Sequence, residues 1–235
     1  MKFTHPLKQA IFLRRYKRFL ADVQMADGET MTIYCPNTGA MTHCMVEGSV
    51  CWYSSSDSVK RKYAHTLELV TTSTGHLACI NSARANSLVC EAIAHLKIKE
   101  LAAYRSIKAE VKYGYENSRI DFLLSDPDRA DCYVEVKSVT LGLEGGQGLF
   151  PDAVSVRGAK HLRELTEMVK QQHRAVLVFC IQHEGINRLS VAEQIDPAYS
   201  HALKEAINAG VEVLAYKAEI SSSELTLVSP LQCVF

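Results

Sequence analysis

The chain has 235 residues, of which 47% are hydrophobic and 22% are charged. This composition supports a packed globular core and argues against a disordered chain. The 26 lysine and arginine residues balance the 26 aspartate and glutamate residues, so the formal net charge is zero. A function in binding nucleic acid therefore has to rest on a local basic patch.

The sequence carries no sign of a membrane span, a secretory signal or a cysteine-based metal site. No apolar run reaches the about 18 residues of a spanning helix, and the N-terminal residues lack the apolar block of a secretory signal. None of the eight cysteines forms a CxxC pair, and no two histidines have HxH or HxxxH spacing. We expect a cytoplasmic protein that associates with no membrane and keeps its thiols reduced.

The first third of the chain consists of short β-prone runs broken by turn residues. Five such runs, separated by turn formers such as Asp27-Gly28 and Pro36-Asn37, predict an OB-like β-barrel over residues 1–82. The expected strands cover 18–25, 30–35, 48–54, 65–72 and 76–81. Barrels of this kind often bind oligonucleotides, although a fold alone does not fix a function.

One basic patch stands out in this region, the sequence RRYKRF at residues 14–19. It combines cations with aromatic rings, which suits phosphate contacts and base stacking. The alternative is a solvated strand edge, since charge runs on solvent-facing strands are common. The candidate nucleic-acid contacts are Arg14, Arg15, Tyr16, Lys17 and Arg18.

Residues 83–235 show a different pattern, which predicts a mixed α/β domain. An amphipathic helix is expected over 85–98, with Asn86 or Ser87 capping its start. Three strands follow in succession, then a helix, a very apolar strand, a short helix and a last strand. The expected ranges are 106–114, 118–126, 131–141, 157–171, 175–182, 198–210 and 211–220.

Two of these strands bring acidic residues onto one face. A period of two places Asp121 on one face of its strand, and groups Glu135 with Lys137 on the next strand. If the two strands pair, the carboxylates converge and offer two hard oxygen ligands for Mg²⁺ or Mn²⁺, with an ammonium group close by. The alternative is a surface ion pair with Lys137 or Arg119. An earlier triplet, Glu110-Val111-Lys112, is expected to be an exposed strand face with an ion pair.

The helix expected over 157–171 begins with a cluster of basic residues. Arg157 and His161 are i, i+4 neighbours, and Lys160 and Arg163 are i, i+3 neighbours, so both pairs share a face of the helix. They suit contact with phosphate, whereas the alternative is an ordinary amphipathic helix that buries its leucines. We take Arg157, Lys160 and His161 as candidate nucleic-acid contacts.

Taken in chain order, Glu91, Asp121 and Glu135-x-Lys137, followed by a helix with Lys160 and His161, resemble the core of PD-(D/E)xK nucleases. The chain as a whole resembles the sugar fermentation stimulation protein family, SfsA, over nearly its full length. The segments that carry this resemblance are PLKQAIFLRRYKRFLADV, YCPNTGAM, RKYAHTLELV, SRIDFLL, CYVEVKSVTL, FPDAVSVRGAKHLREL and GVEVLAY.

The resemblance implies an OB-like barrel followed by a nuclease-like α/β domain, and binding of single- or double-stranded DNA without strong sequence preference. It also implies a link to the regulation of maltose-type sugar metabolism in bacteria. It places metal ligands at Asp121 and Glu135, with Glu91 as an outer ligand, and a catalytic role at Asp121, Glu135 and Lys137. The resulting hypothesis is a Mg²⁺- or Mn²⁺-dependent phosphodiesterase. The alternative is a non-enzymatic DNA-binding regulator that keeps the nuclease scaffold without turnover.

Overall fold

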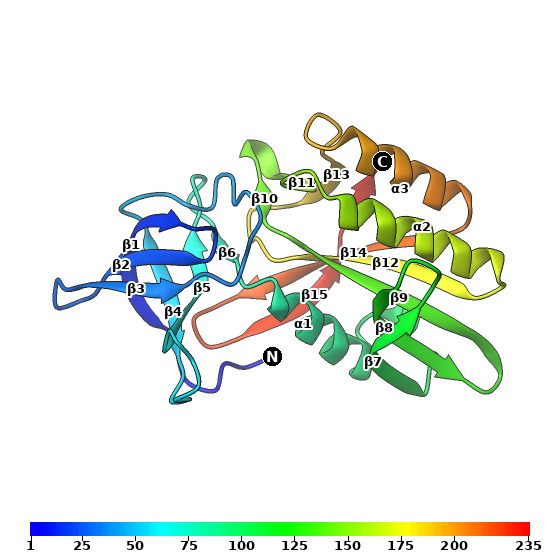
Figure 1. Cartoon of the computed structure of the whole chain (residues 1–235), viewed down its shortest axis with the longest axis horizontal. Coiled ribbons are helices and arrows are strands. Elements are labelled where there is room, and N and C mark those ends of the chain that lie inside the picture. The colour runs from blue at the N-terminus through cyan, green and yellow to red at the C-terminus, as the bar shows by residue number, and fades with distance from the viewer.

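The computed structural model describes residues 1–235 and has two parts, a β-barrel and a larger α/β domain (Figure 1). The barrel closes through antiparallel pairs and one parallel contact, between Tyr34 and Thr66, in the strand order β1-β2-β3-β5-β4. Its strands are β1 (Lys8–Tyr16), β2 (Leu20–Gln24), β3 (Thr30–Tyr34), β4 (Val50–Ser55) and β5 (His65–Thr71). A short strand, β6 (Leu77–Cys79), pairs with β5 in the antiparallel direction. The expected OB-like barrel is confirmed.

The first strand differs from the sequence-based expectation. The expected strand 18–25 corresponds to β2, and no strand was expected before it, whereas β1 runs from Lys8 to Tyr16 and residues 17–19 form the turn to β2. The basic residues at the end of β1 interrupt the apolar alternation that marks a strand. RRYKRF therefore spans a strand end and a turn, so its side chains have different surroundings.

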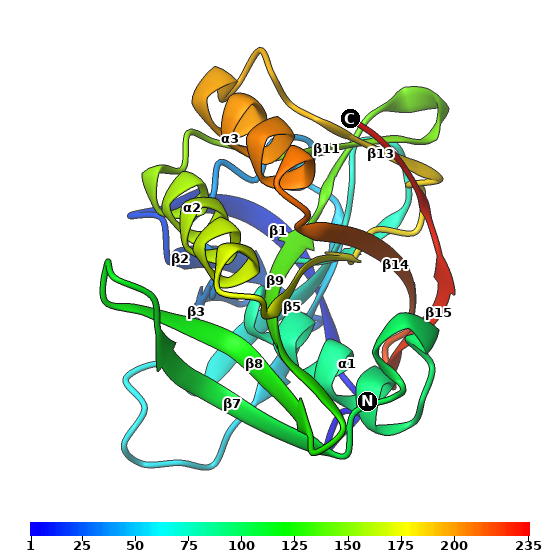
Figure 2. The same ribbon diagram turned by 90° about the vertical axis from the view of Figure 1, so that its right-hand side faces the viewer.

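The α/β domain is a six-stranded mixed sheet with helices on both faces (Figure 2). Its strand order is β15-β14-β12-β9-β8-β7. Helix α1 packs on one face, and α2 and α3 cover the other. The helices are α1 (Ala83–Ala94), α2 (Val156–Lys170) and α3 (Pro197–Asn208), with a 3₁₀ turn at Lys99–Leu101. The strands are β7 (Ser106–Tyr113), β8 (Ser118–Asp126), β9 (Arg129–Val139), β12 (Arg174–Ile181), β14 (Glu212–Ile220) and β15 (Leu225–Pro230).

A small four-stranded sheet at one edge of this domain was not expected from the sequence. Its strands are β10 (Leu141–Gly142), β11 (Gln147–Phe150), β13 (Arg188–Val191) and β16 (Gln232–Val234), and a 3₁₀ turn at Glu144–Gly146 joins the first two. Strands of two to four residues are too short to show a periodic pattern.

No helix of the structure is long and apolar enough to cross a membrane.

The start of α1 corrects a second expectation. The helix begins at Ala83 and follows Ser82, whose side chain makes no capping hydrogen bond. Asn86 and Ser87, which we expected as caps, lie inside the first turns of the helix. This position frees the Asn86 amide for a contact with another strand, described below.

Buried polar contacts join the barrel to the α/β domain. Glu68 on β5 is 1% exposed and accepts two hydrogen bonds from Arg84 on α1, at 2.6 and 3.0 Å. Asp152 accepts a hydrogen bond from the Met41 backbone N–H at 3.2 Å, which ties the loop after β3 to the segment before α2. Asp152 therefore has a structural contact with the barrel.

Near the same junction, the buried side chain of His183 should make the stability of the fold depend on pH. Its side chain is 1% exposed, and burial, with repulsion from His76 and Lys217, lowers the pKa to about 4. The unfolded chain, with a histidine pKa of about 6.5, binds this proton more readily, so stability is lost as the pH falls from about 6.5 towards 4. We expect a loss of about 2 kcal/mol at about pH 5 in urea unfolding. In His183→Gln, the loss of stability that this histidine causes at low pH should disappear. A variant that loses as much stability as the wild type would contradict the prediction.

Candidate functional site

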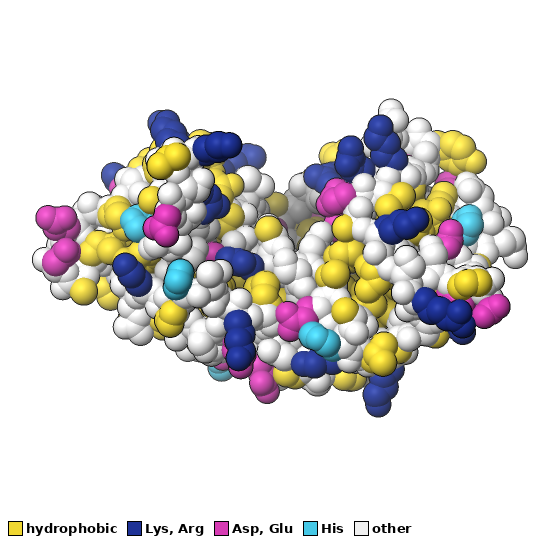
Figure 3. Space-filling view, turned by 90° about the horizontal axis from the view of Figure 1, so that it is seen from below, with side chains coloured by type: hydrophobic (Ala, Val, Ile, Leu, Met, Phe, Trp, Pro, Cys, Tyr) yellow, Lys and Arg dark blue, Asp and Glu magenta, His cyan; other side chains and the backbone are white.

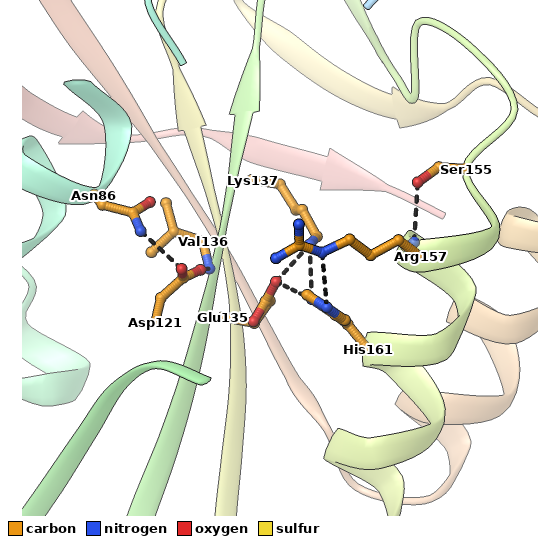
Figure 4. Close-up of polar contacts among 9 residues, drawn as sticks. Asn86, Asp121, Glu135, Val136, Lys137, Ser155, Arg157 and His161 are labelled. Atoms are coloured by element: carbon orange, nitrogen blue, oxygen red, sulfur yellow. Dashed lines mark hydrogen bonds and ion pairs between the residues drawn. The ribbon is translucent and has the colours of Figure 1, made fainter. Parts of the chain in front are cut away.

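Asp121 lies where two neighbouring strands of the large sheet separate. Strands β8 and β9 pair at Phe122 and Val134 and then separate, so the backbone ladder stops before Asp121. The Val136 backbone N–H donates instead to Asp121 Oδ2 at 2.7 Å. The amide of Asn86, reaching over from α1, donates to Oδ1 at 2.7 Å (Figure 4). The carboxylate is held by both contacts.

The electrostatic surroundings of Asp121 favour a nearby cation. Burial and repulsion from Glu135 raise its pKa, and the hydrogen bonds from Val136 and Asn86 offset only part of that effect. Two carboxylates in a poorly solvated place repel each other, and a cation between them removes the repulsion. The folded chain therefore gathers negative charge where a cation would stabilise it.

Glu135 is held from the other side by residues of β9 and α2. Lys137 Nζ donates to Glu135 Oε1 at 2.5 Å, and His161 Nδ1 contacts the same oxygen. Arg157 Nε donates to His161 Nε2 at 3.2 Å, and the Nδ1 side of the ring faces Glu135 (Figure 4). Burial raises the pKa of Glu135, but the contacts with His161 and Lys137 outweigh it and keep the pKa below its usual value. Glu135 is therefore held as a carboxylate.

The second oxygen of Glu135 has no partner. Glu135 is 2% exposed, and Oε2 makes no hydrogen bond. A buried carboxylate oxygen without a donor costs free energy, and a bound cation would satisfy it. No group of three or more His, Cys, Asp or Glu side chains is placed to hold a metal ion. Two carboxylates nevertheless fit Mg²⁺, which usually takes one or two of them and keeps several waters.

Two other expected site residues lie apart from this cluster. Glu91 accepts a hydrogen bond from the Met1 amino group at 2.8 Å, and Asn86 is the α1 residue that contacts Asp121. The carboxylate of Glu91, the expected outer ligand, is therefore paired with the N-terminal amino group. Lys160 donates to the Glu116 backbone oxygen in the β7–β8 turn, so its ammonium group is engaged on the chain itself.

The basic patch at residues 14–18 divides in two. Arg14 donates to Asp22 at 2.8 Å, and the Tyr16 hydroxyl contacts the same carboxylate at 3.2 Å. Arg15 donates to the backbone oxygens of three residues in this region: Arg18 (2.9 Å), Asn37 (2.7 Å) and Gly39 (3.0 Å). Lys17 and Arg18 lie in the β1–β2 turn with exposed side chains and no ion pair. Arg15 thus organises the loops, while Lys17 and Arg18 are available to a ligand.

A cleft of about 630 Å³ lies between the β1–β2 turn and the segment before α2. It is lined by Arg15 and Arg18 on one side and by residues 150–155 on the other. The space-filling view shows a notch between the two parts of the molecule, with Lys and Arg side chains on both rims (Figure 3). Sequence patterns did not place residues 150–155 at a site, because they form an irregular segment with no period.

Comparison with known proteins matches both parts of the chain. A family model described as "SfsA N-terminal OB domain" matches residues 13–80, and one described as "Sugar fermentation stimulation protein RE domain" matches residues 83–224. A protein of Shewanella baltica (strain OS185) named "Sugar fermentation stimulation protein homolog" is 58% identical over 227 residues, 97% of each chain. One of the same name from Saccharophagus degradans is 55% identical over 234 residues, 100% of each.

A solved structure agrees with these matches. It is described as Pyrococcus furiosus SfsA in complex with Ca²⁺, and it superposes with a TM-score of 0.87 at 29% identity, over 100% of this chain and 98% of that chain. The family models and the relatives cover most of the sequence, and the architecture agrees with them throughout. The chain therefore belongs to the sugar fermentation stimulation protein family, SfsA.

Proposed function

We propose that this chain is a DNA-binding protein with a divalent-metal-dependent phosphodiesterase site at Asp121, Glu135 and Lys137. The observation that carries the proposal is the buried Oε2 of Glu135, which has no hydrogen-bond partner. Repulsion from Glu135 also helps to raise the pKa of Asp121. A structural carboxylate pair would be expected to satisfy its oxygens with donors. A carboxylate pair that binds a cation instead leaves one oxygen free to coordinate it.

The Ca²⁺ in the Pyrococcus furiosus structure supports a divalent cation in this family. Ca²⁺ and Mg²⁺ are both hard cations that take oxygen ligands, and they differ in coordination number and rigidity. We propose Mg²⁺ or Mn²⁺ as the ion that supports turnover, held by Asp121, Glu135 and the backbone oxygen of Val136. When bound, such an ion would neutralise the charge of a phosphodiester and stabilise the charge that develops during hydrolysis.

The residues of the chain have separate parts in this reaction. Asp121 is positioned by Val136 and Asn86, and Glu135 by His161, so the two carboxylates stay in place before the substrate arrives. Lys137 lies next to Glu135 and supplies an ammonium group that can orient the attacking water. Arg157 lies behind His161 and adds a positive charge near a bound phosphate.

A non-enzymatic DNA-binding regulator is the second candidate. It is favoured by the absence of a third His, Cys, Asp or Glu ligand, since many sites that turn over hold their metal with more protein groups. In that case the barrel and the cleft would bind DNA, and the nuclease-like core would serve as scaffold. The family name points to an effect on sugar fermentation, and both candidates are compatible with a regulatory role of this kind.

A cleavage assay separates the two candidates. Purified protein is incubated with supercoiled plasmid and with a labelled single-stranded oligonucleotide, in Mg²⁺, Mn²⁺, Ca²⁺ or EDTA. We expect products in Mg²⁺ or Mn²⁺ and none in EDTA. Binding without cleavage under all four conditions would favour the regulator.

A further inference from the structure

The cleft between barrel and α/β domain is longer than one cavity. A second cavity runs along the end of β1 and shares Arg15, Arg18 and Ala40 with the first. A third, of about 160 Å³, shares Phe150 and Asp152 with it. The shared residues place the three cavities side by side along one path.

This path borders the elements that carry the carboxylate cluster. The third cavity is lined by Ser138, which follows Lys137 on β9, and by Ser82, which precedes α1 and its residue Asn86. The large cavity is lined by Ser155, the N-cap of α2, whose first turns carry Arg157 and His161. The cavities therefore lie next to the elements that carry Asp121 and Glu135, although neither carboxylate lines them.

The lining of the large cavity suits both phosphates and bases. Arg15 and Arg18 supply two positive charges, and the single carboxylate, that of Asp152, is engaged by the Met41 N–H. The remaining wall has an apolar part with an aromatic ring, formed by Ala40, Phe150, Pro151, Ala153 and Val154, beside Thr38, Gly39 and Ser155. Unpaired bases expose apolar faces that can contact such a wall, while the phosphates meet the arginines.

The size of the path favours one strand over two. A cavity of about 630 Å³ is of the scale that encloses a small ligand, and a few nucleotides fill it. A duplex stacks its bases inside and presents only phosphates, sugars and groove edges, so the apolar wall would have nothing to contact. The cleft is therefore better matched to a single strand.

We propose that this cleft binds a single strand of nucleic acid between the barrel and the elements that carry the carboxylate cluster. The inference rests on the proposed function, because it names the form of the nucleic acid that the same site receives. It also gives Arg18 and Val154 separate roles, as a phosphate contact and as part of the apolar wall.

The test compares charge changes inside and outside the cleft. Binding of a fluorescent 12-nucleotide oligo-dT and of a 12-base-pair duplex is measured by anisotropy in EDTA. Arg18→Glu should weaken binding of the single strand about tenfold and reduce the slope of log affinity against log salt by about 0.7. The matched control is Lys8→Glu, an exposed cation at the end of β1 far from the β1–β2 turn, which should have little effect.

A second pair of variants guards against an effect on folding. Val154→Glu places a carboxylate in the cleft wall, whereas Val156→Glu changes a residue that is also exposed but does not line the cleft. We expect only the first to weaken binding. Equal effects within each pair, or a duplex that binds as tightly as the single strand, would overturn the inference. Because EDTA is present throughout, an absence of catalytic turnover leaves these results interpretable.

Discussion

Replacing Glu135 by glutamine is expected to abolish metal-dependent cleavage while leaving the fold and the binding of DNA in EDTA intact. Removing one of two carboxylate ligands takes away a charge that holds the ion, and loss of the ion should slow hydrolysis about 1,000-fold or more. Glutamine keeps the size of the side chain and one oxygen that can accept from Lys137 or His161. The packing around residue 135 should therefore survive.

A direct measurement of cation binding makes this prediction independent of turnover. Wild-type protein should bind Mn²⁺ in calorimetry and gain thermal stability from it, and Glu135→Gln should lose both effects. The substitution also removes the repulsion that raises the pKa of Asp121, so the variant should not be less stable for reasons of charge at that residue.

The second Glu-Val-Lys triplet supplies the matched control. Glu110 has the same neighbours in sequence, but its side chain is exposed and makes no ion pair, in contrast to our expectation of one on β7. Glu110→Gln should leave cleavage and Mn²⁺ binding unchanged. Cleavage retained by Glu135→Gln, or lost equally in both variants, would show that the carboxylate cluster is not the metal site.

The contrast between these triplets shows what the sequence can predict. A period of two placed Glu135 and Lys137 on one face, and strand pairing then brought Asp121 close. Neither rule could place Asn86 on Asp121 or His161 on Glu135, because both contacts join elements far apart in the chain. The pattern likewise gave no means of knowing that Arg14 is engaged by Asp22 while Arg18 is free. Those contacts depend on the register of β1 with β2.

The largest effect on stability is expected at Arg84, whose loss would leave a buried charge without its partner. Glu68 is 1% exposed, and Arg84 contacts both of its oxygens, which joins β5 of the barrel to α1 of the other domain. Arg84→Met keeps much of the apolar stem but removes the cation. We expect the free energy of unfolding to fall by about 3 kcal/mol in urea titrations.

A surface pair of the same kind provides the comparison. Arg163 contacts Glu116 at 3.0 Å, but the two side chains are 56% and 43% exposed. Water already solvates both charges, so Arg163→Met should cost less than about 1 kcal/mol. The difference between the two variants measures burial, since the chemical change is the same.

The double variant Arg84→Met/Glu68→Gln shows whether the cost comes from the buried charge or from lost packing. The glutamine introduced at position 68 is neutral, and its oxygen could still accept from Ser54 or Asn81, which both donate to Glu68 in the native chain. If the unpaired carboxylate is responsible, the double variant should be more stable than Arg84→Met alone. If it is equally unstable or worse, the guanidinium acts by filling space between barrel and helix, and the two domains are joined there by packing.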